Sequence, residues 1–253
     1  MIVWQSITEE PENPEKSTAP MPKSDMSRQN FKSTIMKKLL FLTVVFAGCY
    51  FAGRAQNSRL GFTGGASFAN YKAKMDGESD NGNSKTGITA GLLVDVPLGD
   101  HFSFQPALNF VQKGTKDEQT LGGITEKVSL TTNHIEVPLN FLFNTNGDAG
   151  NFFIGAGPSF AFGVSGKWKY EDDQNSLSED VKFGNSDEDD LKGMDLGANF
   201  IAGYSFPNGL FLSANYNLGL SNLVAADPGG DASLKSSYFG IRLGYLLKGK
   251  GKK

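Results

Sequence analysis

The chain contains only two histidines, His101 and His134, which are the first candidates for a general base. A hydrolase with a serine nucleophile needs such a base within hydrogen-bonding distance of the hydroxyl group. His101 falls in a predicted turn. His134 precedes Glu136 by two residues, on a face that we predict to point inward. Because a histidine in a polar interior commonly belongs to a structural hydrogen-bond network, we expect no catalytic residue.

A second candidate for chemistry is the acidic stretch at residues 170–192. Clustered carboxylates can hold Ca²⁺ through their oxygen atoms, but this stretch lacks the ligand spacing of an EF-hand. We therefore expect a solvated loop of mutually repelling charges, with no metal and no cofactor, and a calcium site is the alternative. The acidic residues are Glu171, Asp172, Asp173, Glu179, Asp180, Asp187, Glu188, Asp189 and Asp190.

Six other charged residues share a predicted face with glycines and small polar residues. Three are basic and three are acidic, so opposite charges can pair and share hydrogen bonds if one interior encloses them all. We predict a structural network that plugs this interior, and an ion path or ligand site is the alternative. The six residues are Arg59, Asp95, Lys113, Glu136, Asp195 and Arg242.

The elements that must position these residues are eight segments of alternating apolar and polar character, separated by turn signals. Short connections at residues 97–101, 144–150 and 207–209 alternate with longer polar ones near residues 75–84, 114–127, 169–189 and 222–236. This pattern predicts an all-β fold, an eight-stranded antiparallel up-and-down transmembrane barrel with both termini on the periplasmic side. The segments span residues 59–69, 85–96, 102–113, 128–143, 151–168, 190–206, 210–220 and 237–247.

The alternation also predicts which face meets lipid. In the seventh segment the apolar face includes Leu210, Leu212 and Leu218, whereas Asn215 and Asn217 lie on the other face. An Arg or Lys that faced lipid near the midplane would cost about 2–4 kcal/mol, and the six charged residues all avoid the apolar face. An antiparallel sandwich would also alternate, but the even strand number and the unequal connections favour a barrel.

Two local features qualify this picture. Val128 and Leu130 have the opposite parity from Ile135 and the apolar residues after it, so either a bulge intervenes or this half projects above the bilayer. Aromatic residues near the strand ends predict interfacial girdles. They are Phe102, Phe143, Phe152 and Phe206 toward the short connections, and Trp168 and Tyr170 toward the long ones.

Composition and the N-terminal region point to export. Of the 253 residues 39% are hydrophobic and 31 are glycine, which argues against a conventional core, and a net charge of -3 gives no reason to expect nucleic acid. Lys37 and Lys38 precede an apolar run that ends in a small-x-small box at residues 53–55. This arrangement predicts a signal peptide at residues 36–55, and an uncleaved anchor is the alternative.

The predicted signal divides the chain into four parts. Residues 1–35 are expected to be a disordered extension or to lie upstream of the true start at Met36, residues 56–247 to form the barrel, and residues 248–253 to be a basic tail. Cys49 lies in an imperfect lipoprotein box, and we prefer a cysteine inside the removed signal over a lipidated one. The mature chain would then contain no cysteine and no disulfide.

Several short motifs, taken in order, resemble the PorT-like outer-membrane β-barrel family over nearly all of the predicted mature chain. The matching stretches are residues 87–92 (GITAGL), 102–110 (FSFQPALNF), 112–114 (QKG), 134–139 (HIEVPL), 155–158 (GAGP) and 216–222 (YNLGLSN). Ala107 stands where the family often has Glu, and the chain ends in a basic tail after Leu247 instead of a terminal aromatic residue. The resemblance implies membrane localisation and little about activity.

Three functions follow as hypotheses. The first is a non-enzymatic structural, adhesion or secretion-accessory barrel with a plugged polar lumen. The second is a small-solute channel, and the third is a barrel enzyme that acts on lipid. The first predicts outer-membrane lipid, the outer-membrane assembly machinery and extracellular or secretion proteins as partners.

Overall fold

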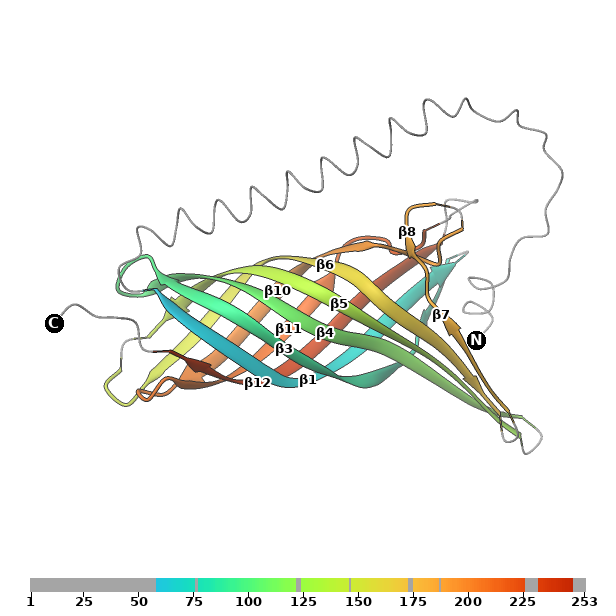
Figure 1. The fold of residues 1–253 in the computed structure, drawn as a ribbon, viewed down its shortest axis with the longest axis horizontal. Coiled ribbons are helices and arrows are strands. Elements are labelled where there is room, and N and C mark those ends of the chain that lie inside the picture. Colours follow the sequence, from blue (N-terminus) through green and yellow to red (C-terminus); the bar gives the residue numbers. More distant parts are fainter. Residues whose placement is uncertain are drawn as a thin grey trace, which may run out of the picture.

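The computed structural model describes residues 58–75, 77–121, 124–145, 147–172, 175–186, 188–225 and 232–247 (Figure 1). The predicted extension at residues 1–35, the signal peptide at 36–55 with Cys49, and the tail at 248–253 lie outside the described residues.

Eight long strands form a closed antiparallel ring, which confirms the predicted all-β, eight-stranded up-and-down barrel. Neighbours in the chain pair in order, β12 pairs with β1, and a direct pairing of β6 with β10 completes the circle. Every strand of the ring thus has a hydrogen-bonded neighbour on both sides. The strands are β1 (Arg59–Met75), β3 (Asn83–Pro97), β4 (Phe102–Leu121), β5 (Ile124–Asn144), β6 (Asn151–Glu171), β10 (Met194–Ser205), β11 (Leu210–Gly219) and β12 (Ser233–Leu246).

The three short connections are tight turns, as predicted. In the last of them the amide of Gly209 donates to the carbonyl of Phe206, and Gly209 has a φ of 96°, a conformation that L side chains rarely adopt. The three turns join β3 to β4, β5 to β6 and β10 to β11, so all three lie at the same end of the barrel. The start of β1 and the end of β12 pair at this end too, and we call it the turn end. The opposite end is the loop end.

At the loop end, more of the chain is strand than the sequence predicted. Residues 114–127 were expected to be a loop, but β4 and β5 stay paired up to Leu121 and Ile124. In Figure 1, β4, β5 and β6 run beyond the other strands and carry β7 (Ser176–Asp180) on their edge. Three short strands complete the loop end: β2 (Glu78–Asn81) pairs with β1, and β8 (Phe183–Gly184) pairs with β9 (Leu191–Lys192).

The outward face carries an apolar band. Phe62 and Leu92 on neighbouring strands are both about half exposed, as are Leu212 and Leu243. At the turn end, Phe102 packs edge-on against Phe143 with ring centroids 5.5 Å apart, and Phe152 packs against Tyr204 at 4.7 Å. Phe206 is exposed beside Tyr204. The four phenylalanines predicted for the turn-end girdle therefore do face outward there.

The predicted loop-end girdle of Trp168 and Tyr170 was wrong, because β6 contains a bulge. Residue Asn133 of β5 pairs with Ser165, whereas His134 pairs with Gly163, so Val164 is an extra residue. Beyond it the inward parity of β6 changes from odd to even. Trp168 is consequently buried inside the barrel, and Tyr170 is half-buried beside it.

The irregular parity in the fourth segment does not come from a bulge in that strand. No register shift separates β4 from β5, and β5 keeps its even residues inward from Leu130 through Glu136. Leu130 therefore points into the barrel and is completely buried. Leu130 packs there against Trp168, so the parity of the apolar residues changes because this end of the interior is itself apolar. The described part of the chain contains no helix with the length and hydropathy needed to cross a membrane.

Two adjacent glycines on β1 test the geometry of this wall. A Cβ on Gly65 would collide with the backbone carbonyl of Ile241 on β12, whereas a Cβ on Gly64 would meet nothing. We expect Gly65→Ala to lower the free energy of unfolding by about 1–3 kcal/mol because a backbone contact cannot give way cheaply. Gly64→Ala should change it by no more than about 0.5 kcal/mol. Denaturant unfolding of the refolded proteins in micelles measures both, and equal effects would contradict the strand pairing.

Candidate functional site

The centre of the barrel contains a buried ion pair that spans it. Lys113 of β4 and Asp195 of β10 are both almost completely buried, and Lys113 Nζ lies 3.0 Å from Asp195 Oδ2. Ser236 of β12 donates to the same carboxylate oxygen at 2.5 Å, and Ser221 donates to the other at 3.0 Å. The Lys113 ammonium also lies 5.4 Å from the centre of the Tyr238 ring. The Asp195 carboxylate therefore links β10 to β4, to β12 and to the loop that follows β11.

A second group of buried charges is linked through a tyrosine. Tyr238 of β12 donates from its hydroxyl to Glu136 Oε1 at 2.6 Å, and Arg242 Nη2 donates to the same hydroxyl at 3.1 Å. Glu136 and Arg242 are both buried but form no direct ion pair among the described residues. Tyr238 was not among the predicted site residues because, as an aromatic residue, it resembles any other strand residue.

The third pair lies at the turn end. Arg59 of β1 and Asp95 of β3 are register partners, and Arg59 Nη2 lies 2.7 Å from Asp95 Oδ2. The Arg59 side chain is 43% exposed, so this pair sits at the rim while the other four charges are enclosed. The six predicted residues thus form two direct ion pairs and one pair that is linked through Tyr238.

A ladder of neutral amides fills the space toward the turn end. Asn199 donates to Asn140 at 2.9 Å, and Asn215 donates to Asn199 at 3.1 Å, which joins β5, β10 and β11. Asn217 donates to Ser159 on β6 at 2.6 Å. These residues are buried, and their inward parity is visible in the sequence, but nothing there indicates which amides meet across the barrel.

Apolar side chains close this polar interior at the turn end. We call this cluster the turn-side layer. Its members come from six different strands of the ring, and all of them are buried. They are Leu93, Leu142, Phe153, Ile201, Phe211 and Leu246.

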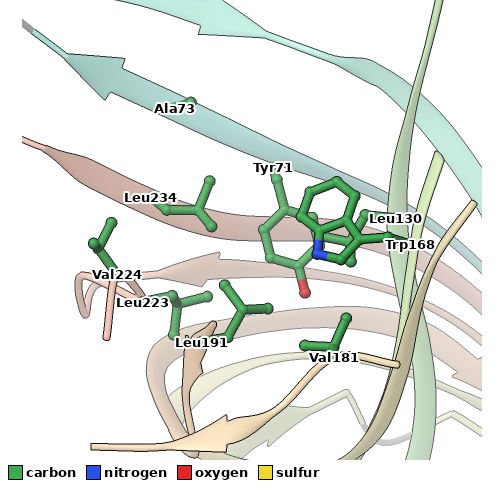
Figure 2. Close-up of a cluster of buried hydrophobic side chains, with 9 residues drawn as sticks. All are labelled: Tyr71, Ala73, Leu130, Trp168, Val181, Leu191, Leu223, Val224 and Leu234. Carbon is green, nitrogen blue, oxygen red and sulfur yellow. The ribbon is translucent and has the colours of Figure 1, made fainter. Parts of the chain in front are cut away.

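A second apolar cluster, which we call the loop-side cap, closes the loop end (Figure 2). Trp168 and Tyr71 belong to one cluster with side chains from the segments between β7 and β10 and between β11 and β12. Leu130 and Leu234 sit one inward position beyond Thr132 and Ser236, directly above the charged centre. The members of the cap are Tyr71, Ala73, Leu130, Trp168, Val181, Leu191, Leu223, Val224 and Leu234.

Backbone hydrogen bonds fasten the loops of the cap to the barrel wall. Val181 donates to Gly166 of β6 at 3.0 Å, and Gly163 of β6 donates to Gly193 at 3.1 Å. Leu223 donates to Leu234 of β12 at 2.8 Å and accepts from Lys192 at 2.8 Å. The cap is therefore an ordered extension of the sheet, held by the same kind of bond that holds the strands together.

The two histidines lie in different halves of the molecule. His134 is buried beneath the cap, its Nε2 lies 3.0 Å from Thr132 Oγ1, and that hydroxyl contacts the Tyr71 hydroxyl at 2.7 Å. His101 is exposed at the turn end and stacks on Phe143. Neither arrangement brings a serine hydroxyl to a histidine among the described residues.

The acidic stretch at residues 170–192 uses some of its carboxylates to shape the loop. Asp190 accepts from the backbone amide of Lys182, and Asp189 accepts from the amide and the hydroxyl of Ser186. The hydrogen bonds from Ser186 hold the pKa of Asp189 below its usual value. Within the described residues, no group of three or more His, Cys, Asp or Glu is arranged to hold a metal ion.

Comparisons with known proteins agree with this architecture. The sequence profile of a family described as "Outer membrane protein beta-barrel domain" matches residues 54–225. No curated protein matches the sequence.

Several solved structures are similar in outline. Ail, the attachment invasion locus protein of Yersinia pestis, is 16% identical with a TM-score of 0.36, and the match covers 76% of this chain and 99% of that one. Neisserial surface protein A is 10% identical with a TM-score of 0.37, covering 74% and 97%. The N-terminal barrel domain of Pseudomonas aeruginosa OprF is 10% identical with a TM-score of 0.31, covering 76% and 98%. Such distant likenesses carry no conclusion about activity.

The buried Lys113–Asp195 pair gives a direct test of the polar centre. Lys113→Met should lower the free energy of unfolding by about 3–5 kcal/mol, because it leaves Asp195 buried without its counter-charge. Lys127 forms a pair with Glu118 at 3.3 Å, but both side chains are more than half exposed. Lys127→Met should therefore cost less than about 1 kcal/mol. Denaturant titrations in micelles compare the two variants, and similar costs would mean that the centre is hydrated and the pair is not structural.

Proposed function

Since this chain belongs to the outer-membrane β-barrel domain family, we propose that it is a closed, non-enzymatic barrel of the Gram-negative outer membrane that acts through its loops and outer surface. Its role would then be structural, adhesive or accessory to secretion. Lipid surrounds the band of exposed apolar side chains. The assembly machinery and extracellular or secretion proteins are the partners that this proposal implies.

The observation that carries the proposal is the filling of the interior. The enclosed charges Lys113, Asp195, Glu136 and Arg242 balance each other, so the centre has no net charge to attract an ion. Above and below them lie the loop-side cap and the turn-side layer, which are apolar apart from the Tyr71 hydroxyl and the Trp168 indole N–H, and the Tyr71 hydroxyl already bonds to Thr132. Because eight strands leave a lumen that side chains can fill, these three layers together support a plug and disfavour a channel.

We further propose an orientation with the loop end outside and both termini in the periplasm. Tight turns at one end and long connections at the other are typical of outer-membrane barrels with periplasmic turns. The aromatic girdle at the turn end would mark the inner interface. The proposed signal peptide at residues 36–55 fits this route, since the family match begins at residue 54, next to the proposed cleavage after Ala55.

Within the wider family, we propose membership of the PorT-like group, supported by the motifs quoted above. One of these motifs, residues 134–139 (HIEVPL), lies in β5. In this chain the motif supplies two buried polar side chains to the interior, those of His134 and Glu136. The non-enzymatic character is supported by the surroundings of His134, which contacts the Thr132 hydroxyl and the ring of Phe183 and has no serine hydroxyl among its described partners.

Conductance in planar lipid bilayers tests the plug. The full chain should give no steady conductance, because the polar centre is covered at both ends by apolar layers. A variant with Leu191→Asn and Leu223→Asn places amides in the cap, where both leucines are 2% exposed, and should also stay closed because the turn-side layer still covers the other end. Flotation of each protein with liposomes verifies insertion. Steady conductance from the unaltered protein would favour the small-solute channel instead.

A further inference from the structure

The outer face of the barrel changes character in regular steps toward the loop end. On the paired strands β1 and β12, the outward register pairs run from Phe68 with Phe239, through Asn70 with Ser237, to Lys72 with Lys235. The two phenylalanines are about 40% exposed, at 38% and 42%, and form the last apolar pair on these strands. An apolar row, a neutral polar row and a basic row therefore follow one another.

The spacing of these rows matches the layers of a bilayer. Lys72 and Lys235 lie four residues beyond the phenylalanines, which is about 13 Å along a strand at roughly 3.3 Å per residue. With the strands tilted by about 40°, the rise along the barrel axis is about 10 Å. Since the headgroup region adds about 5–8 Å on each side of the hydrocarbon core, a flexible lysine ammonium at this height reaches the headgroups.

The basic row is electrostatically unfavourable as it stands. Lys72 and Lys235 are exposed and directly opposite each other, and like charges in such a pair are destabilising. Lys74, the next outward residue on β1, is also exposed and stands opposite Ser233. On the other side of β1, the residues of β2 that face Lys72 and Lys74 are Asn81 and Ser79. Every strand neighbour of the two lysines is therefore neutral or basic.

None of these three lysines forms an ion pair with a described carboxylate, unlike Lys127, Lys167 and Lys169 farther round the barrel. A concentrated positive charge at headgroup height, with no ion pair to a described carboxylate, attracts external anions.

From this arrangement we propose that Lys72, Lys74 and Lys235 form a binding site for the phosphate groups of anionic lipid in the outer leaflet. We call these residues the lysine triad. Ammonium groups are attracted to an anionic membrane surface, and phosphate oxygens can accept from several ammonium groups at once. The bound headgroups relieve the repulsion between Lys72 and Lys235 and fix the height of the barrel in the bilayer. The site rests on the proposed orientation, with the loop end outside.

The test uses the full chain in non-ionic micelles, with diphosphorylated lipid A as the probe and the same lipid after dephosphorylation as its partner. Native mass spectrometry measures how much lipid stays bound. The unaltered protein should retain the phosphorylated form, and the variant K72Q/K74Q/K235Q should bind it about tenfold more weakly or worse. The variant K72R/K74R/K235R should retain it, because arginine keeps the charge.

The matched control is K127Q/K167Q/K182Q, which removes the same charge from lysines outside the triad and should bind within about twofold of the unaltered protein. Equal losses in the two glutamine variants, or equal retention of the two lipids, would overturn the site. If the triad variant fails to refold, the preference of the unaltered protein between the two lipids decides the question. Because binding in micelles depends on neither orientation nor conductance, failure here leaves the plugged barrel intact.

Discussion

The whole structure depends on the need to pair every backbone N–H and C=O group in a lipid environment. An open sheet edge in hydrocarbon would leave such groups unsatisfied at a cost of several kcal/mol each, so a sheet must close. Closure occurs here through the pairing of β12 with β1 and of β6 with β10. Once the ring is closed, the alternation of side chains along each strand decides where each residue lies, because one face of the strand meets lipid and the other meets the narrow interior.

The narrow interior explains why the charges are arranged in linked groups. A lumen formed by eight strands has room for side chains but little for bulk water, so a charge there needs a partner within reach. Lys113 reaches Asp195, and Tyr238 joins Glu136 to Arg242. Apolar layers can then cover this neutral centre at both ends. A barrel filled in this way exposes only its loops and outer wall to other molecules, which is why the proposed role and the proposed lipid site both lie on the outside.

The sequence predicted the strands and the orientation of most of their side chains, because apolar and polar residues alternate with a period of two in segments such as residues 210–220. It also placed the six interior charges on the correct parity. What it could not show was the bulge at Val164, since one extra residue leaves no mark in composition but reverses every later side chain in β6. Trp168 therefore appeared to belong to a girdle. The loop-side cap was missed for a different reason: Leu191 fell at the start of the predicted strand at residues 190–206 and Leu223 in a polar connection, and only the folded chain brings both to Trp168 and Tyr71.

The central claim, a closed barrel with paired edges, is tested most directly by gel migration of the membrane-extracted protein with and without boiling. A closed ring with a filled interior resists detergent at room temperature and stays compact, so the unboiled protein should migrate ahead of the boiled, unfolded form. Identical migration of the two samples, with the protein shown to be in the membrane fraction, would contradict the closed barrel.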